Sequence, residues 1–475
     1  MRASTSAALA CLAVLSVVSC TPNTAPSFDG ALAPVKLAPP LPVAPPVWGH
    51  SKLADTTPAD DVVEVSLTAA ETDVQLGSRT VRMYTYNGQF PGPQLEAKAG
   101  DRVIVHFTNS LAEPTTIHWH GLRISELMDG NPRIQTPVAP GGTFTYDFVV
   151  PEAGTFWYHP HVRANEQVEK GLYGTIVVRA ADEPVYDADR YFVLDDILLQ
   201  GGAFVPFLSG HMEEMHGRFG NLLLTNGKPL STDAAALTDT APRHRVERWR
   251  VVNTANARTF ELGIKNASVR VIGTDGGLLA TGYQLNGRLT VAVGQRYELE
   301  VSFADANPVL ETYVLGVDAN NQTVELTFPI FEGLLTTELA NANFPVIHGR
   351  APSGAVATET RSLQFDAMLD ANNHLMWMIN GVAHSDQLLF TLPKGTPTKL
   401  VLKNMVGMEH PFHLHGQFFE VLNRNEPGFK DTVLVGGNET VEILTTLDNP
   451  GRWMAHCHIL EHSELGMMAE FQVTP

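Results

Sequence analysis

The sequence predicts an all-β protein built from β-sandwich domains. Residues 144–150 and 297–303 alternate between apolar and polar side chains with a period of two, as expected of strands with one buried face. Tight-turn pairs, Pro-Gly, Asn-Gly and Gly-Gly, occur at residues 91–92, 226–227 and 141–142. Sustained helical periodicity is scarce. Together these features favour antiparallel strands packed as sandwiches.

Length and composition indicate a soluble protein of several domains. The chain has 475 residues, which is too long for one small core, and its 44% hydrophobic and 17% charged content is ordinary for a globular protein. Its formal net charge of −19 argues against nucleic acid as a partner, because the phosphates would repel it.

The N-terminal segment predicts export. Arg2 precedes an apolar run, residues 7–18, that is too short for a permanent membrane helix and is typical of a signal peptide. The run ends in Val-Val-Ser-Cys, which resembles a bacterial lipoprotein processing box. We expect residues 1–19 to be the signal and Cys20 to carry a lipid, although an ordinary cleaved signal remains the alternative. Residues 20–60, rich in Pro and Ala, would then tether the protein in the periplasm or outer cell envelope.

Cysteine usage excludes a disulfide framework in the mature domains. Cys11 lies in the expected signal and Cys20 at the expected lipidation site, so only Cys457 remains. A lone thiol in an exported protein is liable to oxidation unless something occupies it, and a metal ion would do so.

An internal repeat predicts the domain organisation. His-Trp-His-Gly at residues 118–121 recurs as His-Leu-His-Gly at 413–416, an offset of 295 (413 − 118). His-Pro-His at 159–161 recurs as His-Cys-His at 456–458, an offset of 297 (456 − 159). Two related domains should therefore flank a middle one without these motifs. The expected domains cover residues 61–181, 182–340 and 341–475.

The four His-X-His pairs predict metal binding between the two related domains. Alternate residues of a strand share a face, so each pair can present two imidazoles to one cavity. Imidazole binds several metals, but a thiolate with two imidazoles and a weak methionine ligand selects copper. His410, Cys457, His462 and Met467 form such a set, whereas the first copy has Pro160 in place of the cysteine.

With these motifs, residues 60–475 resemble the three-domain, laccase-like multicopper oxidases of bacteria. The resemblance implies three cupredoxin-like Greek-key β-sandwich or barrel domains and four copper ions per chain. A mononuclear blue copper would be held by His410, Cys457, His462 and, as axial ligand, Met467. The single copper of a trinuclear cluster would be held by His118 and His413. The coupled pair would be held by His120, His159, His161, His415, His456 and His458.

The resemblance also implies a reaction. The enzyme would couple four one-electron oxidations of a phenolic or similar small donor to the reduction of dioxygen to water. Cys457 would conduct electrons from the blue copper to the cluster through His456 and His458. We expect a monomer that contacts a membrane only through the lipid on Cys20.

Oxygen reduction consumes protons, so an acid near the cluster is expected. Asp129 matches the family's acid, although a turn residue before Gly130 explains it equally well. Ser463 stands where related enzymes often have a glutamate, so proton delivery would fall to Glu464 or to a water held by Ser463.

Two further functions stay open. Residues 211–216, His-Met-Glu-Glu-Met-His, suit a metal-ion oxidase acting on cuprous ion, but a linker turn before a strand at 221–224 is the simpler interpretation. Met408 matches a position used in cuprous oxidation, yet the acid expected beside it is Val406. A non-catalytic envelope scaffold would lack ligand histidines, and none is missing here.

Overall fold

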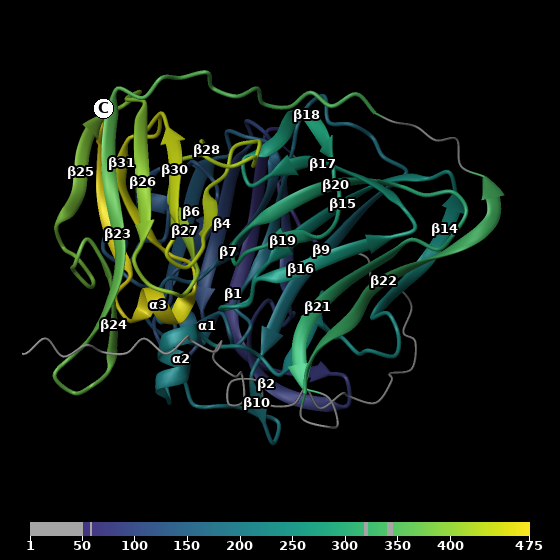
Figure 1. The fold of residues 1–475 in the computed structure, drawn as a ribbon, viewed down its shortest axis with the longest axis horizontal. Helices are drawn as coiled ribbons and strands as arrows, with labels where there is room; N and C mark the ends of the chain where they lie inside the picture. The colour runs from purple at the N-terminus through teal and green to yellow at the C-terminus, as the bar shows by residue number, and fades with distance from the viewer. Residues whose placement is uncertain (1–50, 58, 318–321, 340–344) are drawn as a thin grey trace, which may run out of the picture.

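The computed structural model describes the chain from residue 51 onward, with three gaps: it covers residues 51–57, 59–317, 322–339 and 345–475. The expected signal peptide, most of the expected tether, Cys11 and Cys20 lie outside these residues. The described chain folds mainly into strands, in three successive sets of sheets (Figure 1). None of its helices is long and apolar enough to cross a membrane.

The first set consists of two four-stranded sheets, in the orders β2-β1-β4-β6 and β3-β8-β7-β5. Their apolar faces enclose one core that includes Leu67, Val105 and Trp119. The elements are β1 (Val62–Leu76), β2 (Arg79–Tyr86), β3 (Gly92–Lys98), β4 (Arg102–Asn109), β5 (His118–His120), η1 (Glu126–Met128), β6 (Thr143–Val149), β7 (Gly154–His159), α1 (Ala164–Gln167) and β8 (Gly174–Arg179).

The middle set has a seven-stranded sheet, β13-β12-β9-β15-β20-β17-β18, and a five-stranded sheet, β14-β22-β21-β16-β19. A small β10-β11 ribbon stands apart. The elements are β9 (Ala188–Ile197), β10 (Leu199–Gln200), β11 (Ala203–Phe204), α2 (His211–His216), β12 (Leu222–Thr225), β13 (Lys228–Pro229), β14 (Leu237–Arg243), β15 (Val246–Asn253), β16 (Phe260–Lys265), β17 (Ser268–Thr274), β18 (Gly277–Gln284), β19 (Leu289–Val291), β20 (Arg296–Ser302), β21 (Val309–Val317) and β22 (Thr323–Leu339).

The last set has two five-stranded sheets, β24-β23-β26-β30-β28 and β25-β32-β31-β27-β29. Their core includes Phe412, Trp453 and Cys457. The elements are β23 (Glu359–Leu369), β24 (Leu375–Ile379), β25 (Leu388–Pro393), β26 (Thr398–Asn404), β27 (His410–Leu414), β28 (Phe419–Val421), β29 (Thr432–Val435), β30 (Thr440–Thr445), β31 (Gly451–Cys457), α3 (Leu460–Glu464) and β32 (Met468–Thr474).

The three sets share one strand plan. The order β2-β1-β4-β6 recurs as β12-β9-β15-β20 and as β24-β23-β26-β30, and the order β3-β8-β7-β5 recurs as β14-β22-β21-β16 and as β25-β32-β31-β27. In each set the same two pairs are parallel, for example β1 with β4 and β3 with β8. Long crossover connections produce these parallel pairs, and a period of two in the sequence does not distinguish them from antiparallel ones. The middle set therefore has the same fold without the histidine motifs.

The burial of two strands tests the alternation pattern. In β6 the predicted alternation holds, with Tyr146 and Phe148 buried between more exposed neighbours. In β20 it fails, because Glu298 and Glu300 are buried as well as the apolar residues. These carboxylates pair with Arg248 and Arg270, so the second face of β20 is covered by other elements rather than by water.

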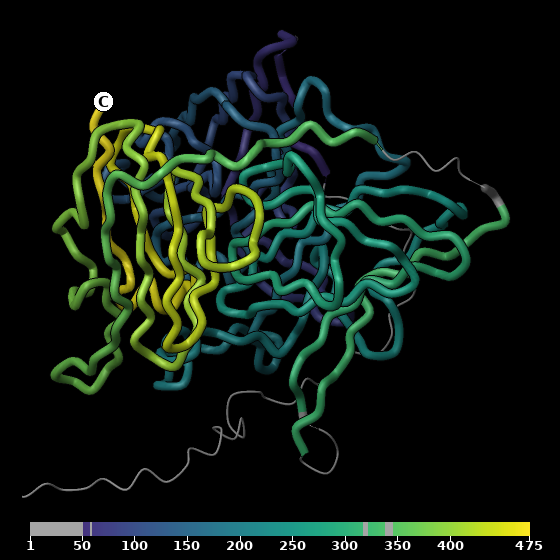
Figure 2. Tube along the Cα trace, turned by 45° about the horizontal axis from the view of Figure 1, so that its top comes forward, coloured from purple at the N-terminus to yellow at the C-terminus, as the bar shows by residue number. Residues whose placement is uncertain are grey.

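The three sets meet along the centre of the molecule. In Figure 1 the sheets of the last set stand beside those of the first, and the middle set lies on the opposite side. The short helices α1, α2 and α3 gather at one end of this junction, where α3 contacts both α1 and α2. The stretch that follows residue 345 crosses the surface from the middle set to the last (Figure 2).

Candidate metal centres

Two strand pairs position the predicted histidines. In the first set β5 runs antiparallel to β7, with His118 opposite His159. In the last set β27 runs antiparallel to β31, with His413 opposite His456. Because alternate side chains share a face, both pairs direct their rings into the space between the two sets. The duplicated motifs thus occupy equivalent places in duplicated sheets.

The eight paired histidines form one buried cluster. Rings from the two sets stack on each other: the centroids of His118 and His415 are 4.0 Å apart, and those of His120 and His413 are 3.8 Å apart. Their ring nitrogens fall into triplets within 4.8 Å of one another, among them 118/413/415, 118/159/161, 120/159/458 and 161/415/456. All eight predicted cluster positions are therefore brought together.

The hydrogen bonds of these rings leave nitrogens free toward the middle of the cluster. Six rings are anchored through one nitrogen. His118 and His413 donate to the backbone carbonyls of Asp129 and Asp431, and His120 and His415 pair with the carboxylates of Asp431 and Asp129. His159 and His456 donate to the carbonyls of Pro160 and Cys457. Within the described residues the Nε2 atoms of His118 and His413 are buried without any hydrogen-bond partner. One anchored and one free nitrogen is the arrangement expected of metal-ligating histidines.

The predicted mononuclear ligands meet on the other side of Cys457. Its Sγ lies 3.5 Å from His410 Nδ1 and 3.7 Å from His462 Nδ1, and those two nitrogens are 3.2 Å apart. Met467 is fully buried in the same core, next to this strand through its backbone hydrogen bond to Cys457. The histidines and Cys457 assigned by the resemblance thus lie in two neighbouring groups, whereas the role of Met467 as axial ligand stays a prediction.

Burial sets the protonation of these groups. It lowers the pKa of His410 and of His456 to about 3, so their imidazoles are neutral and able to bind a metal. Burial also raises the pKa of the Cys457 thiol, and a thiolate at this position requires a bound cation. Inward-facing nitrogens without partners, together with a thiolate, two imidazoles and a methionine, fit copper.

The predicted proton-relay residues fall in different places. Asp129 is buried at the cluster, with its Oδ2 accepting a hydrogen bond of 2.8 Å from His415 Nδ1. Ser463 donates to the carbonyl of Leu460. Glu464 is half-buried on α3, where burial raises its pKa above the ordinary value and the nearby Arg163 offsets part of that rise. Among the described contacts, neither Ser463 nor Glu464 reaches a ligand histidine, so their role in proton delivery stays a prediction.

Residues 211–216 form the helix α2 rather than a linker turn. The carbonyl of Met215 accepts a hydrogen bond of 3.1 Å from His462 Nε2. Trp377 stacks on His462, with centroids 4.1 Å apart, and donates to the carbonyl of Glu214. The helix thus covers the outer edge of the mononuclear centre. Six residues are too few for a helical period to be visible in the sequence, so the pattern alone does not distinguish this helix from a turn.

Sequence reasoning missed Asp431. Its Oδ1 lies 3.1 Å from His120 Nε2, and its carbonyl accepts from His413. Asp129 makes the matching contacts with His118 and His415, so the two aspartates occupy equivalent places. Their offset of 302 (431 − 129) differs from the motif offsets of 295 and 297, so a search at constant spacing does not find the second aspartate.

Comparison with known proteins agrees with this geometry. Family profiles described as multicopper oxidase match residues 68–183 and 356–475. The multicopper oxidase MmcO of Mycobacterium tuberculosis is 30% identical over 451 residues, covering 85% of this chain and 86% of the relative. The multicopper oxidase mco of Staphylococcus epidermidis is 30% identical, covering 82% of this chain and 83% of the relative.

Solved structures are similar over nearly the whole chain. A multicopper oxidase from Pseudomonas thermotolerans has a TM-score of 0.74 and 31% identity, and it covers 88% of this chain and 100% of its own. A Campylobacter jejuni multicopper oxidase described as a metallo-oxidase has a TM-score of 0.78 and 26% identity, covering 94% and 99%. A laccase from Pediococcus acidilactici has a TM-score of 0.78 and 25% identity, covering 94% and 97%.

The fold is therefore three cupredoxin-like domains, and the activity is a copper-dependent oxidation coupled to the reduction of dioxygen. The two repeated domains hold the histidine motifs, and the middle domain repeats the sheets without them. The chain belongs to the multicopper oxidases and is laccase-like.

Proposed function

We propose that this oxidase takes electrons one at a time from a small phenolic or similar donor, through His462. The observation that carries the proposal is the position of Cys457 between two centres: its sulfur faces His410 and His462, while the adjacent His456 and His458 belong to the histidine cluster. When bound, copper supplies the redox chemistry. The protein supplies neutral imidazoles, a covalent route along β31 and a cluster sealed from water.

We propose the ligand assignment given by the resemblance. His410, Cys457, His462 and Met467 would hold the blue copper, and the eight paired histidines would hold the cluster. Their burial and their inward-facing free nitrogens support this. Asp129 is the proposed proton donor at the cluster, supported by its contact with His415.

The donor would dock over α2. Met215 of this helix contacts His462, and Met212 is 49% exposed on its outer side. An electron that reaches Met215 is one hydrogen bond, from its carbonyl to His462 Nε2, away from the proposed blue-copper ligand. The test is oxygen uptake with a panel of phenols, using copper-loaded wild type and Met212→Ala. A change in KM without a change in the blue absorption band is expected, and identical KM values for every donor would contradict docking at α2.

A metal-ion oxidase is the second candidate, and α2 also favours it. The Glu214 carboxylate lies 2.9 Å from His374 Nδ1 and 3.4 Å from His211 Nδ1. A carboxylate between two imidazoles suits a transition-metal ion. Cuprous ion would then be oxidised where it binds, beside His462.

Turnover of cuprous ion and of a phenol would separate the two candidates. If the enzyme is a metal-ion oxidase, His211→Gln with His374→Gln should raise the KM for cuprous ion and leave phenol turnover unchanged. If phenols are the substrates, cuprous turnover should be slow in wild type and insensitive to this double variant.

We propose that in the cell the protein is an exported monomer with a lipid on Cys20. A tether up to residue 60 would precede three domains, at 61–181, 182–340 and 341–475. The lipoprotein-type processing box supports the first part. Mass spectrometry of the mature N-terminus and fractionation of cells test it. A mature chain that begins elsewhere and partitions into the soluble fraction would contradict it.

A further inference from the structure

The middle domain has none of the histidine motifs, yet its Arg296 is buried against the cluster. All five guanidinium N–H groups of Arg296 are used. Nε donates to the carbonyl of Thr155 at 3.1 Å, Nη1 to the carbonyl of Gly294 at 3.0 Å, and Nη2 to the carbonyl of Asp275 at 3.0 Å. The remaining N–H groups of Nη1 and Nη2 donate to the two carboxylate oxygens of Asp431, at 2.8 and 2.6 Å. One side chain therefore joins all three domains.

Asp431, held by Arg296, in turn hydrogen-bonds two of the cluster histidines. Its Oδ1 lies 3.1 Å from His120 Nε2 and accepts from the Thr432 hydroxyl at 2.9 Å. Its carbonyl accepts from His413 Nδ1 at 2.9 Å. His120 comes from the first domain and His413 from the last, and their rings stack. A shift of Asp431 would therefore move both rings.

The backbone of the middle domain also lies against the rings. A Cβ atom added to Gly294 would be 3.1 Å from His458 Cδ2 and 3.2 Å from His120 Cε1. Gly294 has φ +83°, where a side chain is strained, and its carbonyl accepts from Arg296. The turn at residues 294–296 thus fits under the cluster as closely as a glycine allows.

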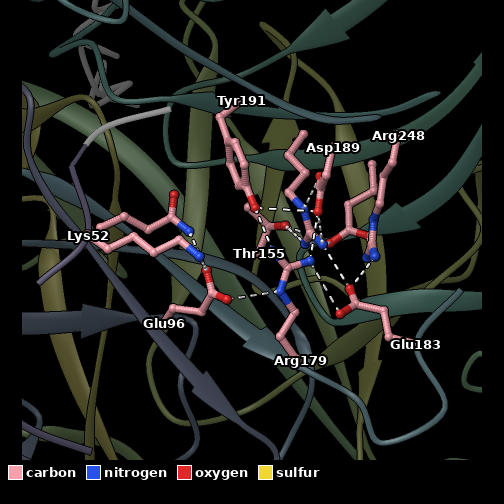
Figure 3. A network of polar contacts seen from close by, with 11 residues as sticks. Lys52, Glu96, Thr155, Arg179, Glu183, Asp189, Tyr191 and Arg248 are labelled. Atoms are coloured by element: carbon pink, nitrogen blue, oxygen red, sulfur yellow. Dashed lines mark hydrogen bonds and ion pairs between the residues drawn. The ribbon is translucent and has the colours of Figure 1, made fainter. Parts of the chain in front are cut away.

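Further buried pairs hold Arg296 in place. The Thr155 hydroxyl donates to Glu298 Oε1 at 2.6 Å and accepts from Arg250 Nη1 at 2.8 Å. Arg250 in turn donates to Asp189 at 2.8 Å. Figure 3 shows Thr155 and Asp189 within this network, between the first and middle domains. Because Thr155 and His159 belong to the same strand, the network also fixes a ligand-bearing strand.

Asp129, the equivalent aspartate, has no arginine paired with its carboxylate among the described residues. Its Oδ2 accepts from His415, but its Oδ1 is buried without a hydrogen-bond partner among the described residues, 3.2 Å from His118 Nδ1. Burial alone would raise the pKa of Asp431, but the Arg296 guanidinium holds that pKa below its ordinary value. The two aspartates share a position and differ in their surroundings.

We propose that Arg296 is a positioning residue for the copper cluster, holding Asp431 so that His120 and His413 are aligned for metal binding. The middle domain would thus complete a metal site to which it contributes no ligand. This inference rests on the proposed ligand assignment. It predicts that loss of Arg296 weakens copper binding at the cluster and spares the blue copper, whose ligands Arg296 does not contact among the described residues.

The experiment uses full-length, copper-loaded Arg296→Lys, Arg296→Gln and Asp431→Asn, compared with Arg190→Lys. Arg190 is a matched control because it also donates two hydrogen bonds to one buried carboxylate, from Nε and Nη2 to Glu247 at 2.5 and 2.9 Å. Copper per chain, the blue absorption band and the electron paramagnetic resonance of the non-blue copper are measured, with the melting temperature of the copper-free proteins.

The blue band should persist in both Arg296 variants and in Asp431→Asn, with cluster copper retained about 10–100-fold more weakly. Arg296→Gln combined with Asp431→Asn should be no worse than either alone. Full cluster copper with an unchanged resonance in Arg296→Gln and Arg296→Lys would overturn the proposal. So would loss of both centres together with a melting-temperature drop equal to that of Arg190→Lys. A wild type that holds no copper would instead contradict the proposed function.

Discussion

The first and last domains offer the clearest comparison in this molecule. Both place a His-X-His strand beside a second such strand, with His118 opposite His159 in one and His413 opposite His456 in the other. Only the last domain has a second centre. Pro160 replaces Cys457, and the position equivalent to His410 is Thr115, which donates to Gln167 at 2.8 Å. In the first domain a hydrogen bond between two neutral side chains thus takes the place of a metal ligand. The proposed electron path is asymmetric because of a few substitutions on one scaffold.

The largest predicted effect separates the histidine cluster from the mononuclear centre. His159→Gln removes a proposed cluster ligand from the first domain only, so oxygen uptake should fall to background while the blue band remains. A reductant should bleach that band, and air should not restore it. Thr115→Ala, at the position equivalent to His410, serves as the control and should keep both properties. Loss of the blue band in His159→Gln would mean that the two centres do not assemble separately.

The two aspartates should respond differently to loss of charge. Asparagine at 129 can still accept the hydrogen bond from His415, so Asp129→Asn should keep its copper. Because the amide is not an acid, oxygen turnover should drop by about 10²–10⁴-fold. Asp431→Asn should instead lose cluster copper. Copper analysis and oxygen-electrode rates measure both, and equal copper loss in the two variants would remove the distinction drawn between the aspartates.

A smaller effect is expected at the turn of the middle domain. Gly294→Ala places a methyl carbon 3.1 Å from a ring carbon of His458 and 3.2 Å from one of His120, closer than ordinary van der Waals contact, at a φ of +83°. Unfolding free energy should decrease by about 1–2 kcal/mol through backbone strain. The cluster resonance should shift while the blue band stays. Gly287, also at positive φ (+91°) but with open space around it, is the control: Gly287→Ala should lose stability and leave the resonance unchanged.

The smallest predicted effect concerns helix α2, which covers His462, and its ion pair with His374. The hydrogen bond to Glu214 raises the pKa of His374 above its ordinary 6.5. The ion pair therefore stabilises the fold fully below the unfolded pKa, and this contribution is lost as the pH rises through the raised folded value. The melting temperature of the copper-free protein should fall slightly across that window. The same slope in His374→Gln would show that this pair has no part in it.

Most of the fold and the eight paired histidines were predictable from the sequence, because the duplication repeats both the strands and these histidines. The residues that hold the cluster histidines in place were not predictable. Asp431 lies at a different offset from its counterpart, and Arg296 reaches it from a domain without any motif. Glu298 appeared solvent-facing in a period-two strand because pattern alone does not show which faces other domains cover.

Copper analysis of Cys457→Ser tests the central claim most directly, namely that one strand holds two separate centres joined through Cys457. The sulfur faces His410 and His462, whereas the histidine cluster takes no atom from it. The variant should therefore lose the blue band and turnover by donors, and keep the cluster copper with its resonance. A blue band that survives, or cluster copper that disappears from a folded variant, would contradict the account.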